Sequence, residues 1–549
     1  MTSVADANRE AIARVLGSEP WLVGVRPARE VVPQMTANLV LHAAPPAPWG
    51  ELSPVLRGGI EGAAAFEGIE PSTIELGAAQ DHSAMAGGAG SITASTPVVV
   101  LEDRANGNRA FHFLMEGFGK TLILGMYDED VRDRLLWIRD ELAAALDTAI
   151  AALGGIDCRA LMAEALRRGD ELHNRNAAAT SMLAELLAPA VDARTDVKRR
   201  IFDFLRGNSQ FFVAVSLAAS RLALDAGHGI EGSSLVTAVG ANGRDCGIKI
   251  SGLGDRWFVA PAEIPEGIFL DGFGLDEAGP SCGDSLLVEC AGLGATVLVA
   301  APRLWPVVGA DEQRARRIFH ETVDIALGEH PHYRVPQLGN GGAPTGIDLI
   351  RVLETGHRPT IDIVMVHREP GRGMIGFGLT SPSVACFEQA GRGVCATVRL
   401  GLLQRVRPRH PDDHAAELPV RADVEEVAVV HVVLGAVVQL AYVALLGRDL
   451  PGVGLDDDVL DLVEDRDRVA AEVGEHAADL LGTGEDGVVG LHRHDAVVGE
   501  VRQDRVDVLR VDGLEVAVRQ GGELLAGQRL RLGGHGASST RMSDFRPRV

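Results

Sequence analysis

A run of helix-type sequence in the middle of the chain, over residues 154–226, constrains the fold more than any other feature. Four stretches place apolar residues at helical spacing: RALMAEALRRGD, AAATSMLAELLAPAV, DVKRRIFDFLRG and FFVAVSLAASRLALDAG. On both sides, short apolar runs of strand type alternate with glycine- and proline-rich turns. The sequence therefore predicts a multi-domain α+β chain, with a small helical domain inserted between two mixed α/β regions.

The chain of 549 residues is too long for a single core. In the first α/β region, residues 97–103 and 110–115 are predicted strands, and residues 128–153 form a helix whose acidic start suits the helix dipole. In the second, CGIKISGLG, RWFVAPA, DSLLVECAGLG, ATVLVAAP and TIDIVMVH are strand-type runs. We predict an N-terminal α/β region at 1–153, a helical domain at 154–226, a second α/β region at 227–395 and a distinct tail at 396–549.

The tail differs in composition from the rest of the chain, since no isoleucine follows Ile375 and no asparagine follows Asn340. Two explanations stay open: a separate segment outside the preceding domain, or an out-of-frame or antisense reading of GC-rich DNA. Residues 427–446 carry no charge and reach membrane-spanning length, but buried valine-rich strands or chance in a valine-rich sequence are the preferred explanations. Alternation around Asp512-Gly513 predicts a β-hairpin.

The net charge of the chain restricts the classes of partner that it can bind. The chain has 52 Lys and Arg against 76 Asp and Glu, a net charge of −24, so bulk electrostatics exclude binding to nucleic acid and to anionic membranes. The cysteines form no CxxC pair, and MTSVADANRE lacks the basic and apolar regions of a secretory signal. We therefore expect a cytoplasmic protein with reduced thiols that is not associated with a membrane.

Two glycine-rich motifs fail the tests for nucleotide binding. EGFGKTL contains Gly-Lys-Thr, but Leu114 stands where a phosphate loop requires glycine; Lys120 is either a phosphate or carboxylate ligand or a solvated loop lysine. GRGMIGFG is followed by LTSPS instead of a helix, which predicts a tight turn. Asp81-His82 offers at most one metal ligand, and no clustered ligand set is visible, so we predict no metal and no cofactor.

The stretch RRGDELHNRN, residues 167–176, gathers polar side chains within an alanine- and leucine-rich region. Its structural interpretation is that Gly169 ends one helix and Asp170 caps the next, with an i, i+4 ion pair between Glu171 and Arg175. Asp170, His173 and Asn174 would then share a helix face. The functional interpretation is a polar lining of a cleft. In GIDLIRV, likewise, Asp348 and Arg351 either form a helix ion pair or hold a small anion.

From about Arg26 to Ala390 the sequence resembles the YlbE/YahG-like family of bacterial proteins. The resemblance is carried by VVPQMTANLVLHAAPPAPW, FEG, EGFGKTL with RLLWIRD, RRGDELHNRN, DAGHGIE, GDSLLVE, LGEHPHYRVPQLG, GIDLIRV and GMIGFGLTSPSVACFEQA. It implies a multi-domain α+β fold with a small helical domain. The resemblance also implies that relatives begin with an additional α/β segment and end soon after the stretch that matches CFEQA.

The family includes one of three subunits of an oxamate carbamoyltransferase, so the resemblance implies a subunit of such a complex in purine or allantoin nitrogen catabolism. The reaction converts oxalurate and phosphate into oxamate and carbamoyl phosphate, with the other subunits as partners. A non-catalytic scaffold or regulatory subunit is the main alternative, and an independent hydrolase or metal enzyme is a third.

Such a reaction needs cations for its anions and groups that polarise a carbonyl or move a proton. We predict that His173, Arg175, Asp284 and Arg351 converge on one cleft. The predicted catalytic residues are His173, Glu171, His228 and Asp284, and the predicted substrate-binding residues are Lys120, Asn174, Arg175, Asn176, Asp348 and Arg351.

Overall fold

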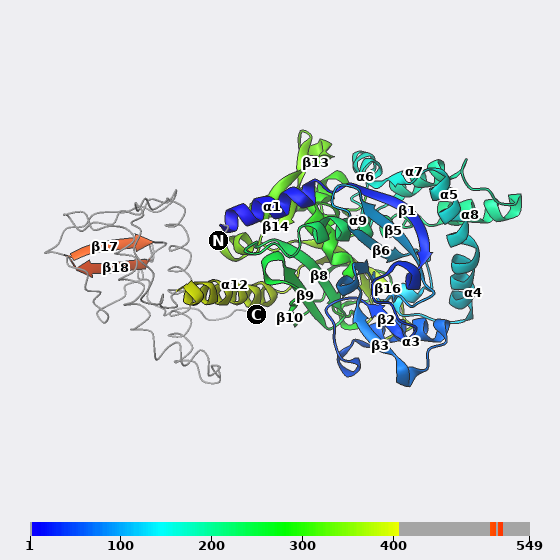
Figure 1. The fold of residues 1–549 in the computed structure, drawn as a ribbon, viewed down its shortest axis with the longest axis horizontal. Helices are drawn as coiled ribbons and strands as arrows, with labels where there is room; N and C mark the ends of the chain where they lie inside the picture. Colours follow the sequence, from blue (N-terminus) through cyan, green and yellow to red (C-terminus); the bar gives the residue numbers. More distant parts are fainter. Residues whose placement is uncertain (1–2, 406–505, 512–513, 520–549) are drawn as a thin grey trace, which may run out of the picture. The chain divides into compact units, whose positions relative to one another are not determined.

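The computed structural model describes residues 3–405, 506–511 and 514–519. The chain divides into two compact units, residues 1–408 and 409–549. The first unit contains helices with mixed and antiparallel sheets, which confirms the predicted α+β class (Figure 1).

The N-terminal part of the first unit is built on a five-stranded sheet of order β4-β6-β5-β1-β7. The central strands β1 and β5 pair antiparallel, with a bulge between Leu22 and Gly24. Helices α5 and α9 pack against this sheet. The strands are β1 (Pro20–Pro27), β4 (Ala84–Met85), β5 (Pro97–Asp103), β6 (Arg109–Phe113) and β7 (Ile156–Asp157). The parallel pair β2 (Leu39–His42) and β3 (Glu75–Ala78) lies outside it, and the helices of this part are α1 (Val4–Leu16), α2 (Ala28–Val31) and α3 (Pro54–Glu67).

The helix predicted at residues 128–153 is confirmed. It consists of α4 (Glu129–Trp137), a π-helical turn at Ile138–Leu142 and α5 (Ala143–Ala152) in succession. Asp128 accepts a hydrogen bond from the Val131 amide and so caps the start of α4. The strands predicted at 97–103 and 110–115 are also present, as β5 and β6.

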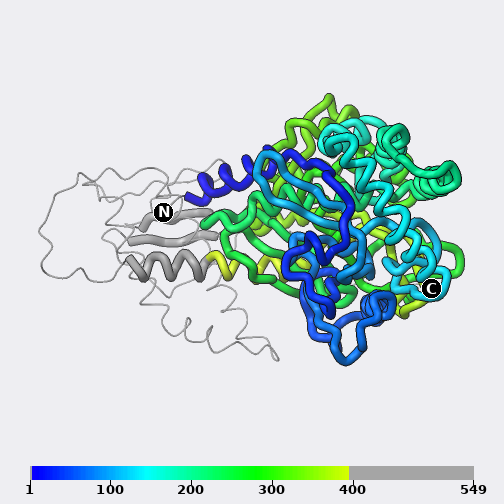
Figure 2. The backbone as a smooth tube through the Cα atoms, turned by 45° about the vertical axis from the view of Figure 1, so that its right-hand side comes forward, coloured from blue at the N-terminus to red at the C-terminus, as the bar shows by residue number. Residues whose placement is uncertain are grey.

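The predicted helical stretches form α6 (Cys158–Arg167), α7 (Ala177–Leu187), α8 (Thr195–Gly207) and α9 (Val213–Ala226). Helices α4 to α8 gather at one end of the first unit in both ribbon and tube views (Figures 1 and 2). Helix α9 differs from the others because it is buried along most of its length, against β5 and β6 on one side and the segment after Gly283 on another. It therefore joins the N-terminal sheet to the rest of the unit.

The third part of the unit contains three small sheets. The first has the order β10-β9-β8-β12, the second the order β11-β16-β15, and the third is the hairpin β13-β14. Their strands are β8 (Val236–Asn242), β9 (Asp245–Ile250), β10 (Phe258–Pro261), β11 (Glu266–Phe269), β12 (Cys282–Gly283), β13 (Ala326–Val335), β14 (Gly341–Ile347), β15 (Ile361–Val366) and β16 (Met374–Thr380). Helices α10 (Glu312–Ile325), α11 (Leu349–Thr355) and α12 (Val384–Arg405) complete this part.

Two buried segments of this part were predicted as strands and are not. DSLLVECA and GATVLVA form the 3₁₀ segments η8 (Asp284–Ala291) and η9 (Gly294–Ala300). Short apolar runs of this kind do not distinguish a strand from a buried helix. Gly292 and Gly294, at φ of 82° and 59°, interrupt the helical conformation between the two segments. Both segments are almost wholly buried.

The GRGMIGFG motif lies in the hairpin of β15 and β16, with Gly371 and Gly373 at positive φ in the turn. The predicted turn is therefore confirmed, and strand β16 stands where a dinucleotide fold would need a helix. One large hydrophobic core runs through the N-terminal sheet, α9 and η9 and includes Leu101, Leu217 and Leu298. Two smaller clusters of buried residues lie around Leu56 and Ile375.

In the second unit, β17 (Val506–Val511) and β18 (Leu514–Arg519) pair antiparallel, with Val511 opposite Leu514. This is the hairpin predicted around Asp512-Gly513. The apolar stretch at residues 427–446 lies outside the described residues. Within the part of the chain that the structure describes, no helix is long and apolar enough to cross a membrane.

Candidate functional site

The RRGDELHNRN stretch forms a tight loop between α6 and α7. Helix α6 ends at Arg167, Gly169 and Leu172 adopt positive φ, and α7 begins only at Ala177. The predicted common helix face of Asp170, His173 and Asn174 is therefore wrong, because residues 170–176 are not helical. Asp170 still binds the N-terminus of α7, since its Oδ2 accepts a hydrogen bond from the Ala179 amide at 2.9 Å.

Glu171 stabilises the conformation of this loop through hydrogen bonds to backbone amides. Its side chain is fully buried, and its carboxylate accepts hydrogen bonds from the backbone amides of His173 and, at 2.6 Å, of Arg175. Its backbone carbonyl accepts a hydrogen bond of 2.8 Å from Gly294 at the start of η9. The predicted Glu171–Arg175 helix ion pair is thus replaced by bonds to backbone, which fix where the next side chains point.

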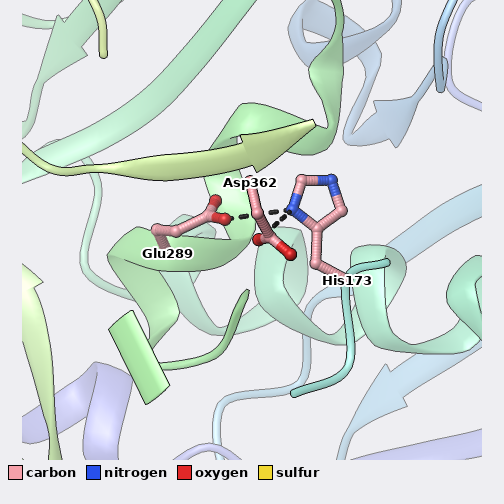
Figure 3. A group of neighbouring side chains, drawn as sticks. All are labelled: His173, Glu289 and Asp362. Atoms are coloured by element: carbon pink, nitrogen blue, oxygen red, sulfur yellow. Dashed lines mark hydrogen bonds and ion pairs between the residues drawn. The ribbon is translucent and has the colours of Figure 1, made fainter. Parts of the chain in front are cut away.

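Three side chains from separate segments meet beside the loop: His173 from the loop, Glu289 from η8 and Asp362 from β15 (Figure 3). We call them the acid–histidine cluster. The Nδ1 atom of His173 lies 3.0 Å from Glu289 Oε1 and 3.3 Å from Asp362 Oδ1. His173 is 5% exposed, and the two acids are wholly buried. The helical part and the β15 sheet therefore share a buried polar site.

Burial and mutual charge set the ionisation of these groups. Burial alone would lower the pKa of His173, but the charges of Glu289 and Asp362 raise it well above its ordinary value. Burial raises the pKa of Glu289 to about 8 and, together with the nearby Asp362, also raises that of Glu171. The pKa of Asp362 is lowered, because its interactions with His173 outweigh its burial. At neutral pH the His173–Asp362 pair is ionised.

Several polar atoms around the acid–histidine cluster lack a hydrogen-bond partner among the described residues. They are Glu289 Oε2, both carboxylate oxygens of Asp362, Asn174 Nδ2 and Asn176 Oδ1. Asn174 approaches Asp362 and helps to lower its pKa without completing a hydrogen bond. Asn176 donates to the His173 carbonyl at 2.8 Å and to Gln210 at 3.1 Å. Buried atoms without partners are uncommon in native proteins and mark places where water, an ion or a ligand binds.

Arg175 lies at the edge of the same loop. Its Nε donates to the Gly169 carbonyl at 3.0 Å and lies 3.5 Å from Asp170 Oδ1, and its side chain is 27% exposed. The loop therefore carries one partly accessible cation beside the buried cluster.

Asp284, the fourth predicted catalytic residue, belongs to a different network. Its carboxylate accepts hydrogen bonds from the amides of Ala44 at 2.8 Å and Ala86 at 2.9 Å, and from Gln80 Nε2 at 2.7 Å. Gln80 in turn accepts a hydrogen bond from the buried Arg221 of α9 at 3.0 Å. We call this set the Asp284 network. Among the described residues, no hydrogen bond or ion pair links it to the acid–histidine cluster.

His228 and Lys120 have ordinary surface or near-surface partners. His228 bonds to Thr237 Oγ1 at 2.7 Å and lies 3.3 Å from Asp255. Lys120 is more than half exposed and pairs with Asp128 at 2.6 Å, as a solvated loop lysine does. Among the described residues, neither forms a hydrogen bond or ion pair with the acid–histidine cluster.

Asp348 and Arg351 match the structural alternative for their motif. Asp348 caps α11 and accepts a hydrogen bond from Ser234 at 2.7 Å. Arg351 lies 3.7 Å from Asp348 and donates to the Ala326 carbonyl. The structure thus joins His173, Asn174, Arg175, Asn176 and Glu171 in one place. In the part of the chain that it describes, it shows no hydrogen bond or ion pair from them to Asp284, His228, Lys120, Asp348 or Arg351.

The comparisons with known proteins agree on one family. The sequence profile described as "Oxamate carbamoyltransferase subunit AllG" matches residues 74–285. The Escherichia coli protein "Oxamate carbamoyltransferase subunit AllG" is 36% identical over 418 residues, which cover 73% of this chain and 100% of that protein. "Uncharacterized protein YahG" from Escherichia coli is 35% identical over 406 residues, or 71% of this chain and 86% of the relative.

A solved structure supports the same grouping. The crystal structure of a conserved protein of unknown function from Enterococcus faecalis is similar to this chain with a TM-score of 0.71 and 36% identity, over 72% of this chain and 98% of that one. Sequence identity of 35–36% over 86–100% of the length of these proteins reflects common descent. Because the match covers the whole of AllG, the additional N-terminal segment expected of relatives is absent from that protein. The chain belongs to the family of bacterial proteins that includes AllG and YahG.

Proposed function

We propose that the chain is a subunit of a multi-subunit carbamoyltransferase. The complex would convert oxalurate and phosphate into oxamate and carbamoyl phosphate, or run the reverse reaction. Support comes from the relative named as a subunit of oxamate carbamoyltransferase, whose whole length this chain matches.

The observation that carries a catalytic role is the set of unpartnered polar atoms around His173. Carbamoyl transfer places negative charge on the carbonyl oxygen of the carbamoyl group, and oriented donors stabilise that charge. Asn174 Nδ2 is such a donor, with no hydrogen-bond partner among the described residues, and Arg175 is a cation at the edge of the same loop. We infer that the loop binds the oxygens of the carbamoyl and carboxylate groups, with Glu171 positioning it.

A second candidate is a non-catalytic scaffold or regulatory subunit, and the burial of the site favours it. Glu289 and Asp362 have no exposed surface, and His173 retains 5%. In a scaffold, the acid–histidine cluster would lock the helical part to the β15 sheet while another subunit carries the reaction.

Reconstitution of the complex tests the two candidates. The full chain is combined with its two partner subunits, and oxalurate formation from carbamoyl phosphate and oxamate is measured with each component omitted in turn. Activity is expected only in the complete mixture. Arg175→Ala is expected to lower the rate at least ~10-fold while the complex still forms, because a bound anion loses its cation.

Arg316→Ala is the matched control, since Arg316 forms an exposed ion pair on α10. A complex that forms and works equally well with Arg175→Ala and Arg316→Ala would support the scaffold. Full activity of the partners without this chain would contradict both candidates.

A further inference from the structure

Hydrogen bonds alone do not give every carboxylate oxygen of the acid–histidine cluster a partner among the described residues. One proton on His173 Nδ1 can satisfy a single acceptor, yet two carboxylates face that atom. Three of their four oxygens, Glu289 Oε2 and both oxygens of Asp362, are buried without a hydrogen-bond partner among the described residues. A buried oxygen without a partner is unfavourable unless a bound group compensates it.

We propose that His173 Nδ1, Glu289 and Asp362 bind one divalent transition-metal ion. Their candidate ligand atoms all lie within 4.8 Å of one another. Ligand atoms about 2.0–2.2 Å from a shared ion are separated by about 3–3.5 Å in tetrahedral or octahedral geometry. The distances of 3.0 and 3.3 Å from Nδ1 to the two carboxylates fall in this range.

The charge of the surroundings favours a cation. The carboxyl groups of Glu289 and Asp362 are wholly buried beside the His173 imidazole, and the carboxyl group of Glu171 is wholly buried in the same loop. Buried carboxylates are strongly unfavourable without a cation to balance their charge. A divalent ion supplies the missing positive charge and also uses the carboxylate oxygens that lack hydrogen bonds.

The ligand types narrow the class of metal. One imidazole nitrogen with two carboxylates suits Zn²⁺, Mn²⁺ or Fe²⁺, whereas Ca²⁺ and Mg²⁺ prefer oxygen ligands alone. In metal sites, neighbouring hydrogen-bonding groups orient the ligand side chains, and two such groups lie beside the proposed ligands. Glu289 Oε1 accepts a hydrogen bond of 3.2 Å from the Ala295 amide, and Asn174 approaches Asp362.

This proposal does not depend on the proposed function, because its readout is metal content. The sequence alone predicted no metal. It did not reveal this site, because His173 and Glu289 are 116 residues apart and form no recognisable ligand motif.

The experiment uses the purified full chain, stripped with a chelator and dialysed separately against Zn²⁺ and Mn²⁺. Elemental analysis is expected to find about one equivalent of one of these metals, and the melting temperature of the loaded chain is expected to rise. Glu289→Gln and Asp362→Asn each remove a ligand charge and are expected to weaken binding at least ~10-fold.

The exposed pair of His357 and Asp324, 3.7 Å apart, provides the control. Asp324→Asn removes an acid beside a histidine and is expected to retain full metal content. Circular dichroism verifies that each variant folds. Less than ~0.1 equivalent of either metal in the wild-type chain would overturn the proposal whatever the variants do. Equal affinity in wild type and in folded Glu289→Gln would overturn it as well.

Discussion

Asp284→Ala is expected to lower the free energy of unfolding by about 3–5 kcal/mol, a large loss for the removal of a single side chain. The Asp284 carboxylate is the acceptor for three buried donors, the amides of Ala44 and Ala86 and the Gln80 side chain. Alanine leaves the two amides without a partner, leaves Gln80 Nε2 with only its bond to the Val239 carbonyl, and removes a negative charge near Arg221. Urea unfolding of the purified chain measures the change.

The control for this prediction is Asp203→Ala, which removes an exposed i, i+3 ion pair on α8. It is expected to cost less than about 1 kcal/mol. Equal losses for the two variants would show that the Asp284 network does not hold the N-terminal sheet, α9 and η8 together.

The same residue gives the stability a pH dependence. Burial raises the pKa of Asp284 from 3.8 to about 7, so the folded state binds its proton more tightly than the unfolded state does. The contribution of Asp284 protonation to the free energy of unfolding is therefore complete below about pH 4 and is lost as the pH rises through 7. Compared with Asp284→Asn, which cannot ionise, the wild type should lose up to about 4 kcal/mol of relative stability between pH 4 and pH 8.

Glu171→Ala is expected to lower the transfer rate of the reconstituted complex at least ~100-fold, and to cost about 2–4 kcal/mol of stability. Glu171 accepts hydrogen bonds from the buried backbone amide of His173 and the partly buried amide of Arg175, and alanine leaves both donors without this acceptor. The loop would then no longer hold Asn174 and Arg175 in place. Initial rates and urea unfolding on the same preparation measure the two effects.

Glu164→Ala is the matched control, because Glu164 lies on the preceding helix and forms only exposed pairs with Arg167 and Arg168. Its rate and stability should stay close to wild type. A folded Glu171→Ala complex with a rate within threefold of Glu164→Ala would show that the loop does not position reacting groups.

The sequence predicted most helices correctly because their apolar spacing is local information. It failed at residues 170–176 because the conformation there depends on distant partners. Leu172 is a fully buried leucine at φ 72°, which isolated leucine rarely adopts and which the surrounding structure imposes. Apolar spacing alone extends the predicted helix through such a residue.

Glu289 and Asp362 were missed as site residues, although a signal was available. Each is an acid within an apolar run, LLVECA and TIDIVMV, and an acid inside a buried segment needs a partner. The sequence could show that both need partners, but the pairing with His173 depends on the packing of η8 and β15 beside the loop. Asp284 carries the same kind of signal, and its partners prove to belong to the Asp284 network.

The catalytic role of the acid–histidine cluster is tested most directly by the rate of the reconstituted complex with His173→Asn. His357→Asn serves as control, since that histidine is exposed and pairs only with Asp324. If the cluster acts in the reaction, His173→Asn lowers the rate at least ~100-fold while His357→Asn leaves it unchanged and both complexes assemble. A His173→Asn complex that assembles normally and works within threefold of the His357→Asn control would contradict that role.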